Sequence, residues 1–541
     1  MTQQGDVNSD ACRAERYVAL VRQLPPRNYI HMLVQLFFSD LEWYYGVIDE
    51  KVFYRELHAW NNLPYAALKR GPHSLPTDMR AFPALLFQVI AHALLFSPTR
   101  LGPALADIKY APGMTLADVA SEYSEAGEAV VLLLRKGGDA TMAQVQAGLL
   151  RASFLKSTAS VVQAWHTIGA TIRDGQEWGL HTVPGNIGGS PLDSVDAAAL
   201  DGVEYRARLW LMLHLWDGHM GVVLGRPLAT RLNCKDWLDV FVEIGRGDPT
   251  PFRMFLLGYD VAYRYLQDIE SLANSSTDAT RKQDILDRAA SIDTAITDGL
   301  RNLPTWAKDD ITDPALTVSH PWLPSARETL LTEVNFVLLA VHRPFVSLSQ
   351  RSRDQARQAA LQILAAQRRL FGMSEPREYL PFNLIFATFD AMVLLATLYI
   401  LFPGEIQSPL AAAELFTSME WGLARLETMK MDGRNKLAAC AFDAVQSLYK
   451  KMQKQRKKRP REEEECGSGA VAGLATTEPS VAAGSEAPTS ESDGMFLEDD
   501  DWADLQELGD LPFALFPNGL TTPENTDTTE DPSLSPRAER A

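Results

Sequence analysis

Apolar residues recur every three or four positions along most of the chain, which is the spacing of amphipathic helices. The clearest case runs from residue 204 to residue 227 and reads EYRARLWLMLHLWDGHMGVVLGRP. It opens polar and then presents an apolar stripe formed by Leu209, Trp210, Leu213, Trp216 and Met220. Proline disfavours helical geometry in the residue before it, so Gly225, Arg226 and Pro227 predict the end of this helix.

The same periodicity predicts helices on both sides of that stretch. They cover residues 29–60, 83–96, 116–134, 141–171, 252–269, 285–303 and 330–345, with another apolar piece at 237–244. Within 141–171 the expected buried stripe is Val145, Leu149, Ala152, Leu155, Ala159, Val162 and Ile168. No alternating strand pattern and no βαβ rhythm stands out. We therefore expect an all-α fold, a large irregular helical domain over residues 25–449, preceded by a poorly ordered lead of residues 1–24.

Residues 384–402, LIFATFDAMVLLATLYILF, form the most apolar segment of the chain. Its length is close to the roughly 20 residues that cross a bilayer. Asp390 lies near its middle, where a charge would cost about 2.5–3.5 kcal/mol on insertion scales. A helix buried on all sides of a helical core has the same pattern. We favour the core helix and expect no membrane partner, and a membrane-associated protein is the alternative.

Several motifs, in this order along the chain, resemble one known family. The stretch above contains Glu204, Arg206, Arg208, Trp210 and Asp217, followed by Gly225, Arg226 and Pro227, and His342, Arg343, Pro344 and Phe345 come later. Phe37, Phe38, Tyr45, Ile48, Asp49 and Phe53 match earlier in the chain, as do Gly179, Leu180 and His181. Together they resemble the fungal-specific transcription factor domain, the middle homology region of zinc binuclear-cluster regulators. Leu211 and Gly218 depart from the family pattern.

The resemblance, which covers residues 37–448, implies a helical regulatory domain that controls metabolic genes, including secondary-metabolite clusters. Family members usually also carry six closely spaced cysteines that bind two zinc ions and read DNA. Here the four cysteines lie at positions 12, 234, 440 and 466, and no CxxC pair exists. Neither zinc nor direct DNA binding can therefore be carried over. Either the protein works without that module, or the sequence begins downstream of it.

The net charge of −18 comes from one end of the chain. From Glu462 onward there are 20 acidic and 2 basic residues, so the preceding part is neutral, with 49 acidic (69 − 20) and 49 basic (51 − 2) residues. A neutral body shows no basic excess for nucleic acid. At the boundary lie eight basic residues, namely Lys450, Lys451, Lys454, Arg456, Lys457, Lys458, Arg459 and Arg461. Residues 450–461 are a nuclear-import candidate, with the solvated end of a helix as the alternative.

Residues 462–541 have the composition of a disordered acidic tail. Between 495 and 516 acids alternate with apolar residues, namely Phe496, Leu497, Trp502, Leu505, Leu508, Leu511, Phe513 and Phe516. The acids keep these side chains solvated and available to a partner, which is typical of an activation segment. The alternative is a short helix that docks back on the body.

The sequence contains no recognisable catalytic pattern. GxxxxGK[ST], HExxH and GxSxG are all absent. Ser153 and Lys156 match SxxK, but SDN and KTG are missing, so we interpret the match as chance within a helix. His214 and His219 are five residues apart and do not share a helical face. We predict no catalytic residue, no metal site and no cofactor.

Taken together, the sequence predicts a nuclear transcriptional regulator, an activator that recruits a coactivator or the transcription machinery through its tail. An import receptor is a second partner. DNA would be reached through a binding partner or a missing zinc-cluster module, and the protein could form homo- or heterodimers. The alternative is a helical ligand-binding protein or enzyme with a regulatory tail, in which buried tryptophans and histidines line a pocket.

Overall fold

The computed structural model describes residues 3–96, 102–135, 140–182, 197–230, 248–275, 282–308, 314–374, 382–406, 408–430 and 435–469. All regular elements in these ranges are helices, which confirms the all-α prediction. Residues 470–541, with the predicted activation segment, lie outside the described residues.

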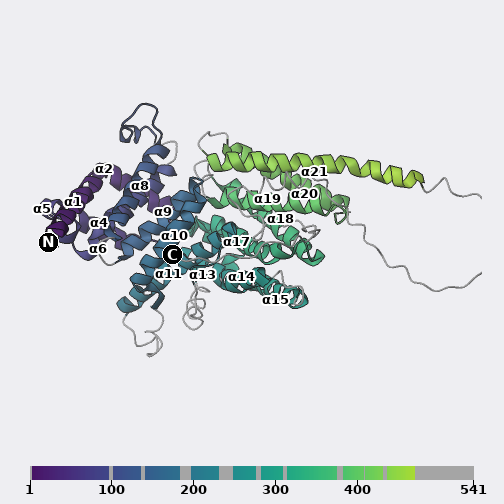
Figure 1. Cartoon of the computed structure of the whole chain (residues 1–541), viewed down its shortest axis with the longest axis horizontal. Helices are drawn as coiled ribbons and strands as arrows, with labels where there is room; N and C mark the ends of the chain where they lie inside the picture. The colour runs from purple at the N-terminus through teal and green to yellow at the C-terminus, as the bar shows by residue number, and fades with distance from the viewer. Residues whose placement is uncertain are drawn as a thin grey trace, which may run out of the picture.

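The first half of the chain forms one group of packed helices, at one end of the molecule in Figure 1. Its members are α1 (Gln3–Val21), α2 (Arg27–Asp40), α3 (Glu42–Tyr45), α4 (Glu50–Asn61), α5 (Tyr65–Lys69), α6 (Thr77–Arg80), α7 (Phe82–Leu95), α8 (Leu116–Arg135), α9 (Met142–Ser157) and α10 (Val161–Glu177). The short 3₁₀ turns η1 (Pro72–Ser74) and η3 (Ala106–Ile108) lie among them. Helix α7 packs against α2, α8 and α9, and every residue from Phe82 to Leu94 is buried.

The second half forms another group of helices beside the first (Figure 1). It contains α13 (Pro251–Val261), α14 (Leu266–Ser275), α15 (Lys282–Arg301), α16 (Pro314–Ser319), α17 (Leu323–His342), α18 (Gln350–Met373), α19 (Phe382–Leu401), α20 (Pro409–Lys430) and α21 (Lys436–Gly469), with 3₁₀ turns η6 (Tyr263–Tyr265), η8 (Thr305–Ala307) and η9 (Arg343–Phe345). Between the groups runs α11 (Ala197–Leu224), which packs against α10 on one side and α13 on the other.

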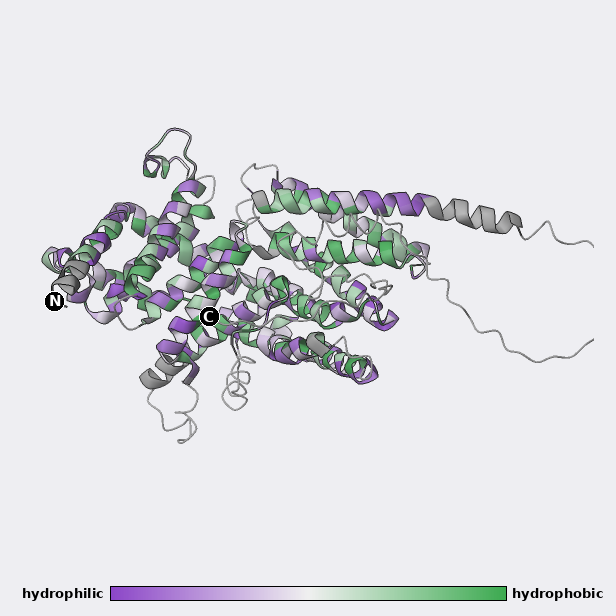
Figure 2. Ribbon diagram, in the orientation of Figure 1, coloured by the Kyte–Doolittle hydropathy of each residue, from purple (hydrophilic) through white to green (hydrophobic). Residues whose placement is uncertain are grey.

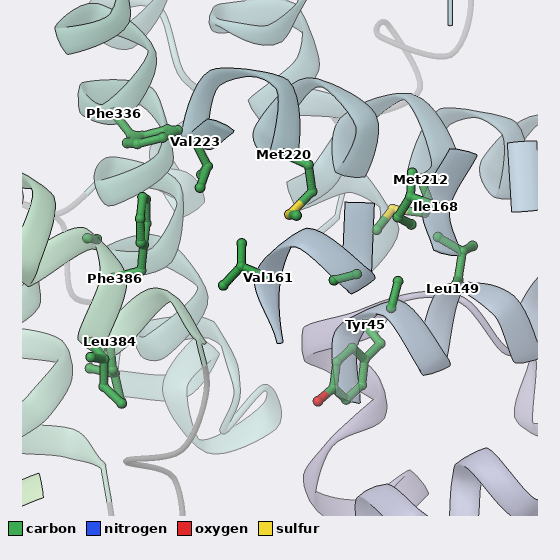
Figure 3. Packing of buried hydrophobic residues seen from close by; sticks show 14 of the residues in the cluster. Tyr45, Leu149, Val161, Ile168, Met212, Met220, Val223, Phe336, Leu384 and Phe386 are labelled. Atoms are coloured by element: carbon green, nitrogen blue, oxygen red, sulfur yellow. The ribbon is translucent and has the colours of Figure 1, made fainter. Parts of the chain in front are cut away.

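Buried residues from both groups form one continuous hydrophobic cluster. Figure 3 shows part of it, where Met212 and Met220 of α11 lie near Val161 and Ile168 of α10. Farther along α11, Val223 approaches Phe336 of α17. The helix predicted between 204 and 227 is therefore a central element, buried from several sides.

The start of the chain, expected from the sequence to be a poorly ordered lead over residues 1–24, contains helix α1, which begins at Gln3. Tyr17 of this helix is fully buried, and its hydroxyl donates a hydrogen bond to the backbone carbonyl of Arg80 at 2.8 Å. Leu20 and Val21 of the same helix are partly buried and also pack against the core.

The helix expected over residues 141–171 is two helices, α9 and α10. The break falls at Ala159, which has a φ of 66°, a left-handed conformation that ends a helix. The turn shifts the helical phase, so Val161 is buried whereas Val162 is 40% exposed. Of the residues predicted to be buried, Val145, Leu149, Ala152, Leu155 and Ile168 are buried. Ala159 is only partly buried, and the prediction is wrong for Val162.

Two helical stretches, Thr77–Leu95 and Leu384–Leu401, are long and apolar enough to span a membrane. Their hydrophobic windows are 83% and 89% buried inside the protein. Figure 2 shows the apolar α19 packed beneath the more polar α21. This burial agrees with the expectation that residues 384–402 form a core helix.

Candidate functional site

The two arginines of the predicted motif on α11 connect that helix to its neighbours. The Arg206 guanidinium stacks over the Trp178 ring at 4.3 Å and donates a hydrogen bond to the Trp178 carbonyl. Arg208 Nε donates to the Gly46 carbonyl at 2.7 Å, and its Nη2 lies 3.4 Å from Glu42 Oε1. Trp210 is buried, and the side chain of Glu204 lies outside the described residues. These positions fasten α11 to α3 and to the end of α10.

Asp217 and the Gly225–Pro227 stop fix the chain where it leaves α11. Asp217 Oδ2 accepts hydrogen bonds from the backbone N–H of Thr230 at 2.7 Å and from its hydroxyl at 2.6 Å. Gly225 has a φ of 60°, the left-handed geometry of a helix C-terminus. Arg226 lies over the Trp165 ring at 4.5 Å. The motif therefore folds the segment after α11 back onto the helix.

The second motif, His342–Phe345, surrounds the end of α17. Arg343 pairs with Asp390, and the two side chains are 8% and 5% exposed. His342 Nε2 lies 3.6 Å from Asp293 Oδ2, and Phe345 is buried. Asp390, the charged residue that disfavours a membrane span, is thus neutralised inside the core by Arg343. The described residues of both motifs therefore organise packing between helices.

The import candidate begins on the exposed face of α21. Lys450, Lys454 and Lys457 are exposed, whereas Lys451 is partly buried. Arg456 stacks over the Phe416 ring at 4.7 Å, and Met452 is fully buried. The side chains of Lys458, Arg459 and Arg461 lie outside the described residues. The basic run therefore continues a helix whose first turns are docked on the body.

A cavity of about 130 Å³ lies where α11 meets both helix groups. Its walls come from α3, α9, α11, α13, η6 and α17. They are mostly apolar and aromatic, and include Trp43, Met212, Trp216, Met254, Phe255 and Leu330. The polar lining is concentrated in a few side chains, chiefly Lys156, His219, Tyr263 and Glu333. A mostly apolar cavity with a few convergent polar groups is the usual form of a small-molecule site.

Glu333 anchors the polar end of this cavity. Its Oε2 accepts a hydrogen bond from the Tyr263 hydroxyl at 2.5 Å and lies 3.1 Å from His219 Nδ1. Burial by itself would raise the pKa of Glu333, but His219, Tyr263 and Lys156 outweigh it and lower that pKa below its ordinary value. Burial, helped by the nearby Lys156, lowers the pKa of His219. Glu333 is therefore a carboxylate held by a neutral imidazole and a phenol.

Lys156 supplies the cation of the cavity. The residue is 5% exposed, and its Nζ lies 4.3 Å from the centroid of the Trp216 ring. Burial lowers the pKa of the ammonium from 10.5 to about 7, with the charge of Glu333 opposing that change. A lysine with such a pKa changes its charge near neutrality, unlike a lysine in water.

Trp43, Trp216 and His219 line this cavity, as the alternative of a pocket lined by buried tryptophans and histidines expects in general terms. Ser153 and Lys156 also line it, although the SxxK match on its own is a chance pattern within a helix. The available signal was a lysine inside an otherwise apolar helix, because every residue of α9 from Ala143 to Ser157 is buried. His214 and His219 do diverge as predicted, the former bonding to Thr230 and the latter facing Glu333.

Within the described ranges, no group of three or more histidine, cysteine, aspartate or glutamate residues could hold a metal ion. Of the cysteines in those ranges, Cys12 and Cys440 are free and exposed.

The fold and these contacts define a large helical domain built around one central helix, with a half-open cavity beside it. Residues 34–236 match the family described as "Fungal specific transcription factor domain". The match confirms, over these residues, the resemblance inferred from the sequence. The His342–Phe345 motif lies beyond the matched residues. The family is a class of transcription factor domain and not a class of enzyme.

Two individual proteins are also similar to the chain. "Probable transcription factor sol4" of Alternaria solani is 24% identical over 206 residues, which are 36% of this chain and 32% of that protein. The chain thus spans about a third of this relative's length. The solved structure titled "Structure of the K. lactis CBF3 core" has a TM-score of 0.48 and 11% identity, covering 85% of this chain and 96% of the other. A likeness this low carries no information about function.

Proposed function

We propose that the protein is a nuclear transcriptional regulator that activates metabolic genes, such as those of secondary-metabolite clusters. The observation that carries this proposal is the family match over residues 34–236. The relative from Alternaria solani, named as a probable transcription factor, supports the same class. The helical body serves as the regulatory domain, and the protein is not an enzyme.

The activating part is the acidic segment 495–516. Its apolar residues alternate with acids, so they stay solvated until a coactivator or the transcription machinery offers an apolar groove. Coupled folding and binding then places residues such as Trp502 and Phe513 into that groove. Folding of this segment back onto the body is the competing role.

The basic run at the end of α21 serves nuclear import. It supplies eight basic residues within 450–461 to an import receptor. The body is electrically neutral, so we infer that DNA is contacted through a binding partner or through a zinc-cluster module outside this sequence. Either arrangement is compatible with homo- or heterodimers.

One experiment tests both segments. The full chain is fused to a fluorescent protein and to a bacterial DNA-binding domain without an import signal, in cells with a matching reporter gene. We expect nuclear fluorescence and reporter transcription. Trp502→Ala with Phe513→Ala should keep the nuclear signal and lose most transcription. A variant that lacks import should lose both the nuclear fluorescence and the reporter transcription. It carries glutamine in place of Lys454, Lys457, Lys458, Arg459 and Arg461.

These replacements spare Met452 and Arg456, which hold α21 on the body. As a matched control, five glutamines at exposed basic residues of the first helix group should change neither readout. A nuclear fusion that never activates would refute the activator role. Nuclear signal that survives loss of the basic residues would refute their role in import.

A further inference from the structure

The cavity beside α11 has a chemistry that the proposed transcriptional role does not use. Its polar lining includes one carboxylate, that of Glu333, and one amine, that of Lys156. Lys156 precedes α11 in the sequence and Glu333 follows it. Burying such groups costs several kcal/mol per ion unless partners compensate. A protein that needed a stable core here would gain by filling the space with apolar side chains. The retained charges therefore point to a ligand.

We propose that this cavity binds a small organic acid with an aromatic or other flat apolar body, and that Lys156 pairs with the carboxylate of the ligand. This inference goes beyond the proposed function and does not depend on the acidic tail. The ligand would be the chemical signal that the regulatory body receives.

The walls favour a flat apolar body. Trp43 and Trp216 come from α3 and α11, and Phe255 comes from α13, so aromatic rings face the cavity from three elements. Aromatic pairs gain about 0.5–1.5 kcal/mol beyond the area they bury, which rewards a planar ligand over a bulky aliphatic one. The volume of about 130 Å³ has room on the order of ten water-sized atoms. That is the size of a one- or two-ring acid.

The polar end favours an acid over a base. A ligand ammonium would have to compete for Glu333, whose Oε2 already faces the Tyr263 hydroxyl and His219 Nδ1. Lys156 can turn from the Trp216 face toward a carboxylate, because its ammonium has three donors on a flexible stem. A charge-assisted hydrogen bond between the two is about twice as strong as a neutral one. The amine is therefore the group that recognises the ligand.

Burial also makes the recognition pH-dependent. The titratable groups that share the cavity with Lys156 are Glu333 on α17, His219 on α11, Tyr44 on α3 and Tyr263 in η6. Glu333 is held ionised, and burial raises the pKa of both tyrosines well above neutrality. Burial lowers the pKa of His219 and so keeps its ring neutral. Lys156, with a pKa of about 7, is the group that changes charge between pH 6 and pH 8.

A bound carboxylate needs the protonated lysine, so affinity should fall as the pH rises through 7. The protonated fraction of a group with a pKa of about 7 drops roughly tenfold between pH 6 and pH 8. The ligand acid stays ionised throughout this range. Affinity for the acid should therefore weaken about tenfold, whereas a neutral ligand of the same shape should be unaffected.

The place of the cavity suggests what binding does. Its walls combine α3 and α9 of the first helix group, the central α11, and α13 and α17 of the second group. A ligand that touches all of them adds contacts between the groups and rigidifies the body. Ligand binding should thus raise the thermal stability of the full chain.

The test uses the purified full chain and two probes of matched shape, 2-naphthoate and neutral 2-naphthylmethanol. Quenching of tryptophan fluorescence and calorimetric titration measure binding, since Trp43 and Trp216 line the cavity. We expect 2-naphthoate to bind at least tenfold more tightly than the alcohol at pH 6. Lys156→Met should weaken naphthoate about tenfold or more and change the alcohol less than threefold. Lys51→Met, at an exposed lysine of α4, is the matched control and should change neither.

Lys156→Met removes a buried charge and keeps a side chain of similar length, and continued binding of the alcohol reports an intact cavity. Equal affinity for acid and alcohol would overturn the proposal. So would naphthoate binding that Lys156→Met or a rise to pH 8 leaves unchanged, or no saturable binding of either probe. Because binding is measured without transcription, failure here leaves the proposed function standing, and failure of the reporter experiment leaves this inference standing.

Discussion

The buried pair between Arg343 and Asp390 gives the most direct test of how the core is organised. Asp390 sits inside α19, whose hydrophobic window is 89% buried, and its side chain is 5% exposed. Changing Asp390 to alanine leaves the guanidinium of Arg343 buried without its counter-charge. Breaking a buried ion pair by removing one partner costs about 3–5 kcal/mol. We expect Asp390→Ala to destabilise the protein by that amount.

Urea unfolding followed by circular dichroism measures the loss. With an m value of about 3 kcal/mol/M, the expected loss corresponds to a midpoint lowered by roughly 1–1.7 M. The double variant Arg343→Met, Asp390→Leu should regain the stability of the unmodified protein or exceed it by about 1–4 kcal/mol, because it removes both charges and fills the space.

The surface pair of Arg301 and Asp298 provides the control. Their side chains are 72% and 54% exposed, so Arg301→Ala should cost less than about 1 kcal/mol. The reasoning is refuted if Asp390→Ala costs no more than this control. It is also refuted if the double variant is as unstable as the single one, since the charges would then not account for the loss.

Two further predictions concern the first helix group. A Cβ added at Gly148 would collide with the side chain of Thr171 where α9 crosses α10, so Gly148→Ala should cost about 1–3 kcal/mol. Gly169→Ala, with no atom within 4 Å of the added Cβ, should instead stabilise by about 0.5–1 kcal/mol, and equal midpoints for the two variants would contradict this packing. Burial lowers the pKa of His92 from 6.5 to about 4, so the unfolded chain takes up this proton first as the pH falls. Stability should be lost between pH 6.5 and pH 4, by up to about 3 kcal/mol from this residue. The unmodified protein should lose stability relative to His92→Phe as the pH falls from 6.5 to 4, and a stability difference between the two that does not change with pH would contradict the assignment.

Several features of the fold follow from the sequence, because helix formation depends on a local pattern. The apolar stripe after Glu204 and the Gly–Arg–Pro stop predict α11, and the structure has that helix end at Leu224. The run from Leu384 to Phe402 predicts a core helix, and its burial agrees. The ordered motifs also identify the transcription factor domain, which the family match confirms over residues 34–236.

Other features depend on contacts between residues far apart in the chain. The phase shift at Ala159 and the docking of α1 through Tyr17 need a partner surface that no local pattern describes. The pairing of Arg343 with Asp390 joins residues on two different elements. In each case the sequence shows the residue but not the neighbour that decides its role.

The cavity depends most strongly on residues that are far apart in the chain. Lys156, Trp216 and Glu333 lie on α9, α11 and α17, and in the sequence each looks like an ordinary member of a helix. Only the packing of both helix groups against α11 brings them around one space. The chain by itself thus determined which segments are helical and which family they resemble, because periodicity and motifs are local. The tertiary structure decided where charge is buried, because burial depends on what the rest of the molecule places around each side chain.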